Sequence, residues 1–223
     1  MSERPTLPLA VLISGRGSNM VAIAQACAAG RIKAAVSHVI SDEPGAGGLQ
    51  RARDLGLRTS VVARADFADA AAFEEALTRT LDERPQQLIV LAGFMRILSK
   101  AFVTRYAGRM LNIHPSLLPQ YRGLHTHARV LAAGEAEHGA SVHFVTPELD
   151  AGPLVLQSRV AVHAGDTEQR LAERVRATEY IIYPKVIGWI AQGRLVWRDG
   201  APWFDGERLD APMVEDWRSV AED

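Results

Sequence analysis

Two polar side chains interrupt the apolar run Met110–His114, and their types suit chemistry at a carbonyl group. Asn112 and His114 lie two residues apart, so in a strand they point to the same face, whereas Ile113 points away. An asparagine amide can donate a hydrogen bond to a developing oxyanion, and a histidine exchanges protons near neutral pH. The simpler alternative is a polar pair that only caps the end of a strand. Burying such a pair is costly unless it is used or satisfied, which favours a catalytic role.

An acidic turn at residues 148–153 supplies a third candidate, Asp150. On composition alone, Glu148 and Asp150 are typical of solvated turn residues. A carboxylate that folded over His114 would instead orient the imidazole ring. Asp150 therefore becomes a catalytic candidate only if the turn lies against that histidine.

A glycine-rich turn, Ser14–Asn19, separates an apolar run from a helical pattern. Glycines at this position let backbone N–H groups approach an anion, and the helix N-terminus adds a favourable dipole. The turn carries Met20 where a dinucleotide-binding fingerprint needs its third glycine, and it lacks the Lys-Ser/Thr pair of a P-loop. The sequence therefore predicts a site for a single phosphate, the alternative being a tight turn without a ligand.

Five histidines crowd the central third of the chain and raise the alternative of a metal site. No cysteine or carboxylate partner with zinc-like spacing accompanies them, so we expect hydrogen-bonding histidines and no metal. The five are His114, His125, His127, His138 and His143.

Short apolar runs alternate with amphipathic segments over the first half of the chain, which predicts right-handed βαβ units. The expected fold is α/β, a Rossmann-like and mostly parallel sheet of about seven strands. The expected strands are Leu7–Ile13, Ala34–Ile40, Arg58–Val62, Leu88–Leu91, Met110–His114, Ser141–Val145 and Leu154–Val162, followed by a small hairpin of Leu195–Trp197 with Trp203–Phe204. The expected helices are Asn19–Ala29, Gly47–Leu55, Asp69–Asp82, Ser99–Tyr106, Thr126–Ala133 and Asp166 to about Ile190.

Parallel sheets bind ligands at the carboxyl ends of their strands, where the strand order reverses. The glycine turn and the Asn112–His114 pair both follow predicted strands, so both should lie at that edge. In the last long helix we expect Asp166 and Gln169 to form a capping pair and Pro184 to introduce a kink.

Composition excludes several classes of protein. The 223 residues carry 25 basic and 26 acidic side chains, a formal net charge of −1, so we expect no general nucleic-acid or anionic-membrane binding. No apolar stretch approaches the roughly 20 residues of a membrane span. The single cysteine, Cys27, cannot form an internal disulfide, which favours a reducing, cytoplasmic location. The oligomeric state is not determined by these features.

Six segments, in order and covering nearly the whole chain, resemble the phosphoribosylglycinamide formyltransferase family. They are VLISGRGSNM (11–20), LAGFMRILS (91–99), LNIHPSLLP (111–119), GLHTH (123–127), HGASVHFV (138–145) and ELDAGP (148–153). The Asn-x-His-Pro segment is shared by folate-dependent formyltransferases in general. The glycine turn and Leu-His-Thr-His are more particular to the purine enzyme.

The resemblance implies transfer of the formyl group of 10-formyltetrahydrofolate, a cosubstrate, to the amine of 5-phosphoribosylglycinamide in purine synthesis. It implies no metal and no partner beyond these small molecules. Carried over residue by residue, the catalytic set is Asn112, His114 and Asp150; the phosphate or ribose side is held by Gly17, Ser18 and Asn19; and Glu179 meets the glycinamide substrate. The folate pocket is formed by Met95, Arg96, Ile97, Leu98, Asn112, Thr146 and Asp150.

These implications give a single formyltransferase domain over residues 1–223. Its phosphate-binding half would cover about 1–107, and its catalytic and folate-binding half about 108–205. One position departs from the family pattern, because Ala70 stands where relatives often carry an arginine that meets the folate tail. Arg64 or Arg96 could replace that contact.

Three alternatives remain at this point. A methionyl-tRNA formyltransferase would add a carboxyl-terminal domain and a formyltetrahydrofolate hydrolase an amino-terminal one, and we expect neither at this length. The phosphate-type turn also favours a small phosphorylated acceptor. A non-catalytic module that binds a phosphorylated ligand would explain the turn but would leave Asn112, His114 and Asp150 without a role.

Overall fold

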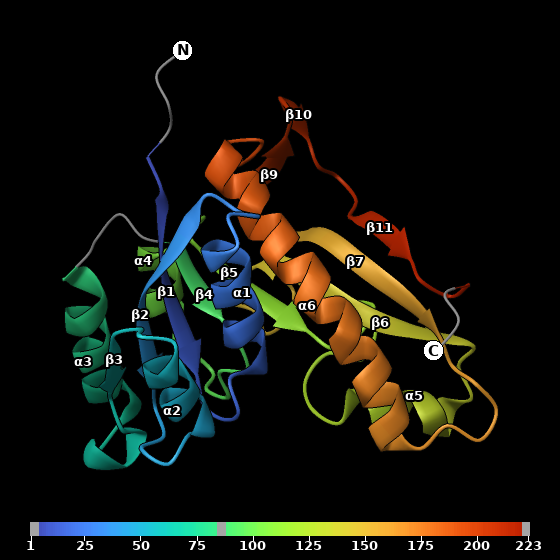
Figure 1. Cartoon of the computed structure of the whole chain (residues 1–223), viewed down its shortest axis with the longest axis horizontal. Coiled ribbons are helices and arrows are strands. Elements are labelled where there is room, and N and C mark those ends of the chain that lie inside the picture. Colours follow the sequence, from blue (N-terminus) through green and yellow to red (C-terminus); the bar gives the residue numbers. More distant parts are fainter. Residues whose placement is uncertain (1–4, 84–87, 220–223) are drawn as a thin grey trace.

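The computed structural model describes residues 5–83 and 88–219 and builds them around an eight-stranded sheet (Figure 1). The strand order is β11-β7-β6-β5-β4-β1-β2-β3. The strands are β1 (Leu7–Ile13), β2 (Ala34–Ser41), β3 (Thr59–Val61), β4 (Leu88–Leu91), β5 (Met110–His114), β6 (Glu137–Phe144), β7 (Leu154–Ala161) and β11 (Met213–Asp216). The prediction of a mostly parallel α/β sheet of about seven strands is confirmed, and β11 at the edge brings the count to eight.

All neighbouring strands run parallel except where β6 enters the sheet. Strand β6 is antiparallel to both β5 and β7, and β11 adds parallel to β7. The chain builds outward from β1 through β2 to β3 and then returns to place β4 on the other side of β1. The strand order therefore reverses between β1 and β4, so the loops after these two strands flank the crevice where such sheets bind ligands.

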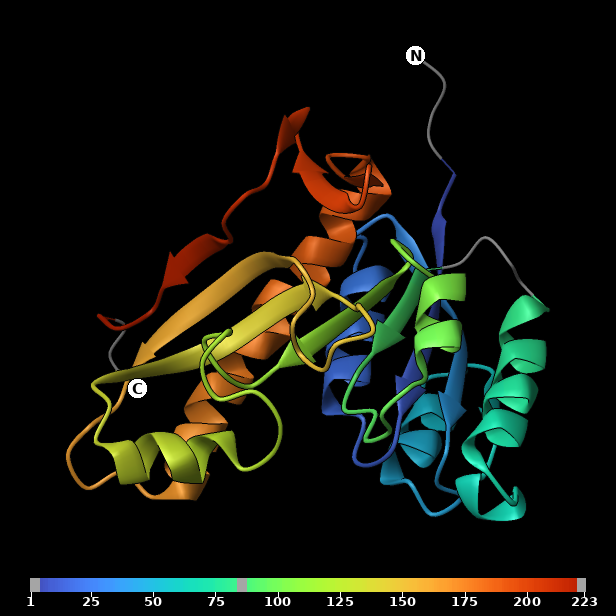
Figure 2. The same cartoon turned by 180° about the vertical axis from the view of Figure 1, so that it is seen from behind.

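Helices cover both faces of the sheet, as Figures 1 and 2 show from opposite sides. The helices are α1 (Ser18–Ala28), α2 (Gly47–Asp54), α3 (Ala70–Asp82), α4 (Lys100–Arg105), α5 (Thr126–Ala133) and α6 (Glu168–Gln192). Residues of α1 and α6 share one hydrophobic core, and residues of α3 and α4 share a second. Strand β1 contributes Leu9, Val11 and Ile13 to the first core and Ala10 and Leu12 to the second, the period of two expected for a strand buried on both faces.

The helix boundaries follow local signals with one correction. Ser99 caps α4 as predicted, since its hydroxyl accepts from the Phe102 N–H at 3.2 Å. The predicted capping pair of Asp166 and Gln169 is wrong, because Thr167 caps α6 and accepts from the Arg170 N–H. The Asp166 carboxylate instead accepts two hydrogen bonds from the Arg174 guanidinium, from Nη1 at 2.6 Å and from Nη2 at 3.0 Å.

The chain after α6 forms a small second sheet before it returns to the main one. Its strands are β8 (Leu195–Arg198), β9 (Ala201–Phe204) and β10 (Glu207–Arg208), and they contain the predicted hairpin. Helix α6 itself runs unbroken through Pro184. Among the described residues, no helix is long and apolar enough to span a bilayer.

Candidate active site

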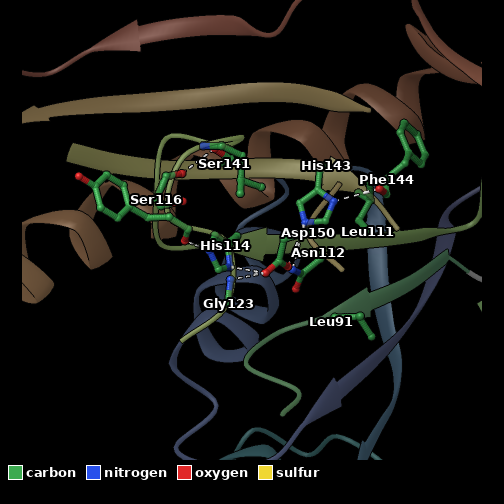
Figure 3. Close-up of polar contacts among 12 residues, drawn as sticks. Leu91, Leu111, Asn112, His114, Ser116, Gly123, Ser141, His143, Phe144 and Asp150 are labelled. Carbon is green, nitrogen blue, oxygen red and sulfur yellow. Dashed lines mark hydrogen bonds and ion pairs between the residues drawn. The ribbon is translucent and has the colours of Figure 1, made fainter. Parts of the chain in front are cut away.

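Strand β5 ends with Asn112 and His114 on one face, opposite polar residues of β6. The antiparallel register pairs Asn112 with His143 and His114 with Ser141. Figure 3 shows these side chains gathered at the carboxyl end of β5, together with Asp150 from the turn that follows β6. Two polar positions on each of two neighbouring strands thus form one polar patch in an otherwise apolar sheet.

His114 is almost completely buried, and both of its ring nitrogens face oxygen atoms. Nε2 lies 3.0 Å from the carbonyl oxygen of Tyr121, and Nδ1 lies 3.4 Å from Oδ2 of Asp150. The second distance is longer than the 2.7–2.9 Å typical of a charged hydrogen bond. The Nδ1–H of a protonated ring could therefore be shared with another oxygen that entered the site.

Asp150 reaches the histidine from the turn after β6. Its side chain is 9% exposed, and its Oδ2 also accepts the backbone N–H of Gly123 at 3.0 Å. The residue adopts a left-handed backbone, with φ of 49°, which aspartate tolerates better than most side chains. The sequence could not establish this contact, and the structure brings Asn112, His114 and Asp150 together.

His143 fixes the orientation of Asn112. Its Nδ1 lies 2.9 Å from the Phe144 carbonyl oxygen, so Nδ1 carries the proton and donates. Burial lowers the pKa of His143, which keeps the ring neutral and leaves Nε2 as an acceptor. Asn112 Nδ2 lies 3.1 Å from that Nε2 and donates to it. The second N–H of the Asn112 amide remains available to a ligand.

A pocket with mainly apolar walls opens beside this polar patch. Among its lining residues are Leu91, Phe94, Ile97, Leu98, Val103 and Val145, with Arg96, Asn112, His143, Thr146, Glu148 and Asp150 as polar members. Of the predicted folate residues, only Met95 does not line it. Met95 is 64% exposed, and its backbone N–H donates to Ser14 Oγ at 2.8 Å.

Neither arginine suggested for the folate tail is free of protein contacts. Arg96 donates from Nε to Asp42 and from Nη2 to Glu43, and Arg64 donates to the Phe67 carbonyl oxygen at 2.8 Å. A contact between either guanidinium and a folate tail stays a prediction.

The glycine turn adopts a left-handed backbone at Gly17 and packs closely against helix α2. Gly17 adopts φ of 67° immediately before α1, which begins at Ser18. A Cβ atom at Gly17 would lie 2.9 Å from the Cα atom of Gly48, so no side chain fits without movement. The turn packs against the start of α2, where the Gly48 N–H donates to the Gly15 carbonyl oxygen at 2.9 Å.

Asn19 and Glu179, which are 160 residues apart in the chain, meet beside this turn. Asn19 Nδ2 donates to Glu179 Oε2 at 2.8 Å, and both side chains are buried. Burial raises the pKa of Glu179, while the hydrogen bond from Asn19 opposes that effect. Asn19 Oδ1 is buried and has no hydrogen-bond partner among the residues that the structure describes. An unsatisfied buried acceptor of this kind suits a ligand that brings an N–H or O–H group.

Three residues of interest escaped the sequence prediction as site members. From the sequence, His143 is a candidate only for a metal site, but its position two residues after Ser141 in a predicted strand places both side chains on one face. Arg16 and Arg176 line one pocket between the glycine turn and the first turns of α6. In a chain so rich in arginine, no local signal distinguishes these two.

The remaining histidines do not gather into a metal centre. His127 Nδ1 lies 3.0 Å from His138 Nε2, and burial lowers the pKa of both rings, that of His138 to about 3. Across residues 5–83 and 88–219, no group of three or more His, Cys, Asp or Glu side chains is arranged to hold a metal ion.

Comparison with known proteins agrees with this geometry. Residues 7–187 match the model of the formyl transferase family. The chain is 52% identical over 201 residues to the phosphoribosylglycinamide formyltransferase of Escherichia coli (strain K12), covering 90% of this chain and 95% of that protein. It is also 43% identical over 187 residues to the trifunctional purine biosynthetic protein adenosine-3 of Drosophila melanogaster, covering 83% of this chain and 14% of that protein.

A solved structure of the phosphoribosylglycinamide formyltransferase of Coxiella burnetii superposes with a TM-score of 0.89 at 48% identity, covering 94% of this chain and 99% of that one. Fold, site geometry and sequence similarity therefore agree, and the chain belongs to the formyl transferase family, among its phosphoribosylglycinamide formyltransferases.

Proposed function

We propose that the protein transfers the formyl group of 10-formyltetrahydrofolate to the primary amine of 5-phosphoribosylglycinamide, a step of purine synthesis. The observation that carries the proposal is the convergence of Asn112, His114 and Asp150, of which Asn112 and Asp150 line the apolar pocket. The names of the related proteins give the acceptor and the pathway.

The apolar pocket suits the flat ring system of a folate. Its aliphatic and aromatic walls can enclose the ring, and polar groups at one end can orient the formyl group. We assign Arg96, Ile97, Leu98, Asn112, Thr146 and Asp150 to folate binding through this lining. Met95 is assigned only through its backbone, which helps to hold the same loop.

The glycine turn suits the phosphate of the acceptor. The backbone of Gly17, Ser18 and Asn19 opens helix α1, whose N-terminus favours negative charge. Arg16 and Arg176 line the adjoining pocket together with Glu168 and Glu173, so two guanidinium groups are available there beside two carboxylates. Asn19 Oδ1 and the Glu179 carboxylate would meet the polar groups of the glycinamide ribonucleotide.

Attack of the amine on the formyl carbon forms a C–N bond and moves negative charge to the formyl oxygen. The free N–H of Asn112 and the Nδ1–H of protonated His114 would donate to that oxygen. The amine loses a proton, which Asp150 can accept through a water molecule, and the folate nitrogen gains one as its bond to carbon breaks. Proton and charge balance without any further reactant.

A turnover assay tests the proposal. The protein is mixed with 10-formyltetrahydrofolate, and the release of deformylated folate is followed with and without phosphoribosylglycinamide, with His114→Ala as the inactive control. We expect fast release only when the amine is present. Equal release with free formate as product would indicate a hydrolase, and formylation of charged initiator tRNA would indicate the tRNA enzyme. We expect these small molecules to be the partners and the location to be cytoplasmic.

A further inference from the structure

A hydrogen-bonded network ties together three loops at the carboxyl edge of the sheet. Ser14 directly follows β1, Asp42 directly follows β2, and Met95 and Arg96 belong to the loop between β4 and α4. Ser14 Oγ accepts the Met95 N–H at 2.8 Å and donates to Asp42 Oδ1 at 2.6 Å. Arg96 Nε donates to the other carboxylate oxygen of Asp42. Each loop therefore contacts the other two through Asp42 and its partners.

Asp42 is the centre of this network. Its side chain is 1% exposed, so its charge depends on partners within the protein and not on water. Each carboxylate oxygen has a donor, one from the glycine turn and one from the loop that lines the apolar pocket. The Arg96 guanidinium extends further to Glu43. A buried anion that is satisfied from two directions fixes the positions of both donors.

Backbone contacts reinforce the same arrangement. The Ser14 N–H donates to the Gly93 carbonyl oxygen at 3.1 Å, which joins the two loops directly. The glycine turn carries the groups that we assign to the phosphate, and residues 96–98 line the pocket that we assign to the folate. The hydrogen bonds described here thus connect the two proposed substrate sites, and none of them involves Asn112, His114 or Asp150.

We infer that Asp42 is a positioning residue that couples the phosphate loop, residues 14–19, to the folate loop, residues 93–98. This inference rests on the proposed function. Group transfer between two bound substrates needs both at a fixed separation, and small misplacements are costly. A shared buried anion holds the two loops as one unit, so loosening it weakens the binding of both substrates.

The test compares Asp42→Ala and Asp42→Asn with a matched control, Asp166→Ala. The side chain of Asp166 is also little exposed, 4%, and is paired with an arginine, but it lies outside both loops. We expect Asp42→Ala to raise the KM of both substrates about tenfold, the usual scale for loss of a charged hydrogen bond, with a smaller change in kcat. Asp42→Asn keeps the shape and one oxygen for Arg96 but removes the charge and one acceptor, so its KM values should lie between those of wild type and Asp42→Ala.

Amide hydrogen exchange supplies a readout that does not depend on turnover. In Asp42→Ala we expect faster exchange in residues 14–19 and in residues 93–98 together, and no such change in Asp166→Ala. The inference is wrong if exchange rises in only one loop, if only one KM changes, or if Asp166→Ala raises both KM values equally. A wild-type protein without amine-dependent turnover would refute the proposed function alone, and the exchange data would still decide whether Asp42 couples the loops.

Discussion

His114 and Asp150 form one unit at the scale of single residues. The carboxylate lies against the imidazole and is itself held by the Gly123 N–H, so each side chain is oriented by the other. In the proposed reaction, the histidine donates to the formyl oxygen and the carboxylate accepts a proton from the amine through water. Neither role survives without the geometry of the pair.

We therefore predict that His114→Ala and Asp150→Asn each lower kcat by about 10²–10⁴-fold, the range typical of positioned acid–base groups. The double variant should cost little more than the worse single variant, because residues that act as a unit are not additive. Steady-state kinetics at saturating substrates measure this effect, with circular dichroism as the control for folding. A folded Asp150→Asn protein with a near-normal rate would contradict the assignment.

Glu179 illustrates a residue whose environment opposes stability. Burial raises its pKa, so the folded state binds a proton more tightly than the unfolded state, and stability falls as pH rises above the unfolded value near 4.5. Glu179→Gln removes the charge and keeps the shape. We predict a Tm increase of about 2–4 °C at pH 7.5, a smaller one at pH 4.5, and weaker binding of phosphoribosylglycinamide.

Thermal denaturation at the two pH values checks this prediction. Glu75→Gln is the control, since Glu75 is an exposed carboxylate of α3 whose ion pair contributes little. A Glu179→Gln protein with a lower Tm than wild type at both pH values would contradict this prediction, because it would show that the ionised carboxylate stabilises the folded state.

The glycine turn is the element to which we assign binding of the phosphate. Gly17 and Gly30 have almost the same left-handed backbone, with φ of 67° and 68°. Of these two glycines, Gly17 is the one at which an added Cβ atom would meet backbone, the Cα atom of Gly48. At Gly30 no heavy atom lies within 4 Å of an added Cβ atom. The two positions therefore separate backbone strain from steric displacement of the turn.

We predict that Gly30→Ala lowers stability by about 1 kcal/mol through backbone strain alone, and that Gly17→Ala lowers it further because its Cβ atom must also displace the Gly48 backbone. Only Gly17→Ala should raise the KM of phosphoribosylglycinamide, by about tenfold, with little effect on the folate KM. Urea denaturation and steady-state kinetics measure the two effects. Equal loss of affinity for both substrates in Gly17→Ala would argue against a phosphate site at this turn.

Helix α5 and strand β6 are joined by the His127–His138 contact, which makes this region sensitive to acid. His138 has a pKa of about 3 in the fold against 6.5 when exposed, so the unfolded state binds more protons between these values. The contribution of neutral His138 to the free energy of unfolding is therefore fully present above pH 6.5 and is lost as the pH falls towards 3. We predict that His138→Asn flattens the decline of the unfolding free energy between pH 7 and pH 4.

Urea denaturation across that pH range measures the decline. His163→Asn, at an exposed histidine of the β7–α6 loop, is the control and should leave the slope unchanged. Identical slopes in wild type and His138→Asn would mean that the buried pair does not contribute to acid sensitivity.

At the scale of the whole molecule, the chain closes one edge of its sheet with its own C-terminal region. Strand β11 pairs with β7, the Trp217 N–H donates to the Arg159 carbonyl oxygen at 2.7 Å, and Leu209, Met213 and Trp217 pack against the main core. Without this segment, β7 would present an unpaired edge, which is a site for aggregation.

We predict that ending the chain after Arg208 lowers the Tm by about 5–10 °C, because three partly buried apolar side chains are lost. The kcat should change little, since no proposed catalytic residue lies beyond that point. Glu215→Gln, which removes only the ion pair with Lys185, is the control and should have almost no effect. An unchanged Tm after truncation would show that β11 contributes nothing to stability.

Much of this molecule follows from local pattern. Apolar runs bounded by glycine turns predicted the parallel sheet, because a strand buried on both faces must be apolar throughout. The spacing of Asn112 and His114 predicted their common face, because side chains alternate along a strand. The six family segments supplied the remaining candidates and the expected reaction. The division into a single domain with two halves stays a prediction.

Other features depend on which strands and loops become neighbours, and no local pattern encodes that. The Asn19–Glu179 contact spans 160 residues, and the Asp42–Arg96 contact spans 54. Strand β11 was missed because its edge pairing needs only four residues. The prediction that Asp166 caps α6 is wrong because Arg174, which lies eight residues later in α6, binds its carboxylate. Short-range propensity builds the elements, whereas contacts between distant polar groups exist only once the tertiary structure has brought the strand ends together.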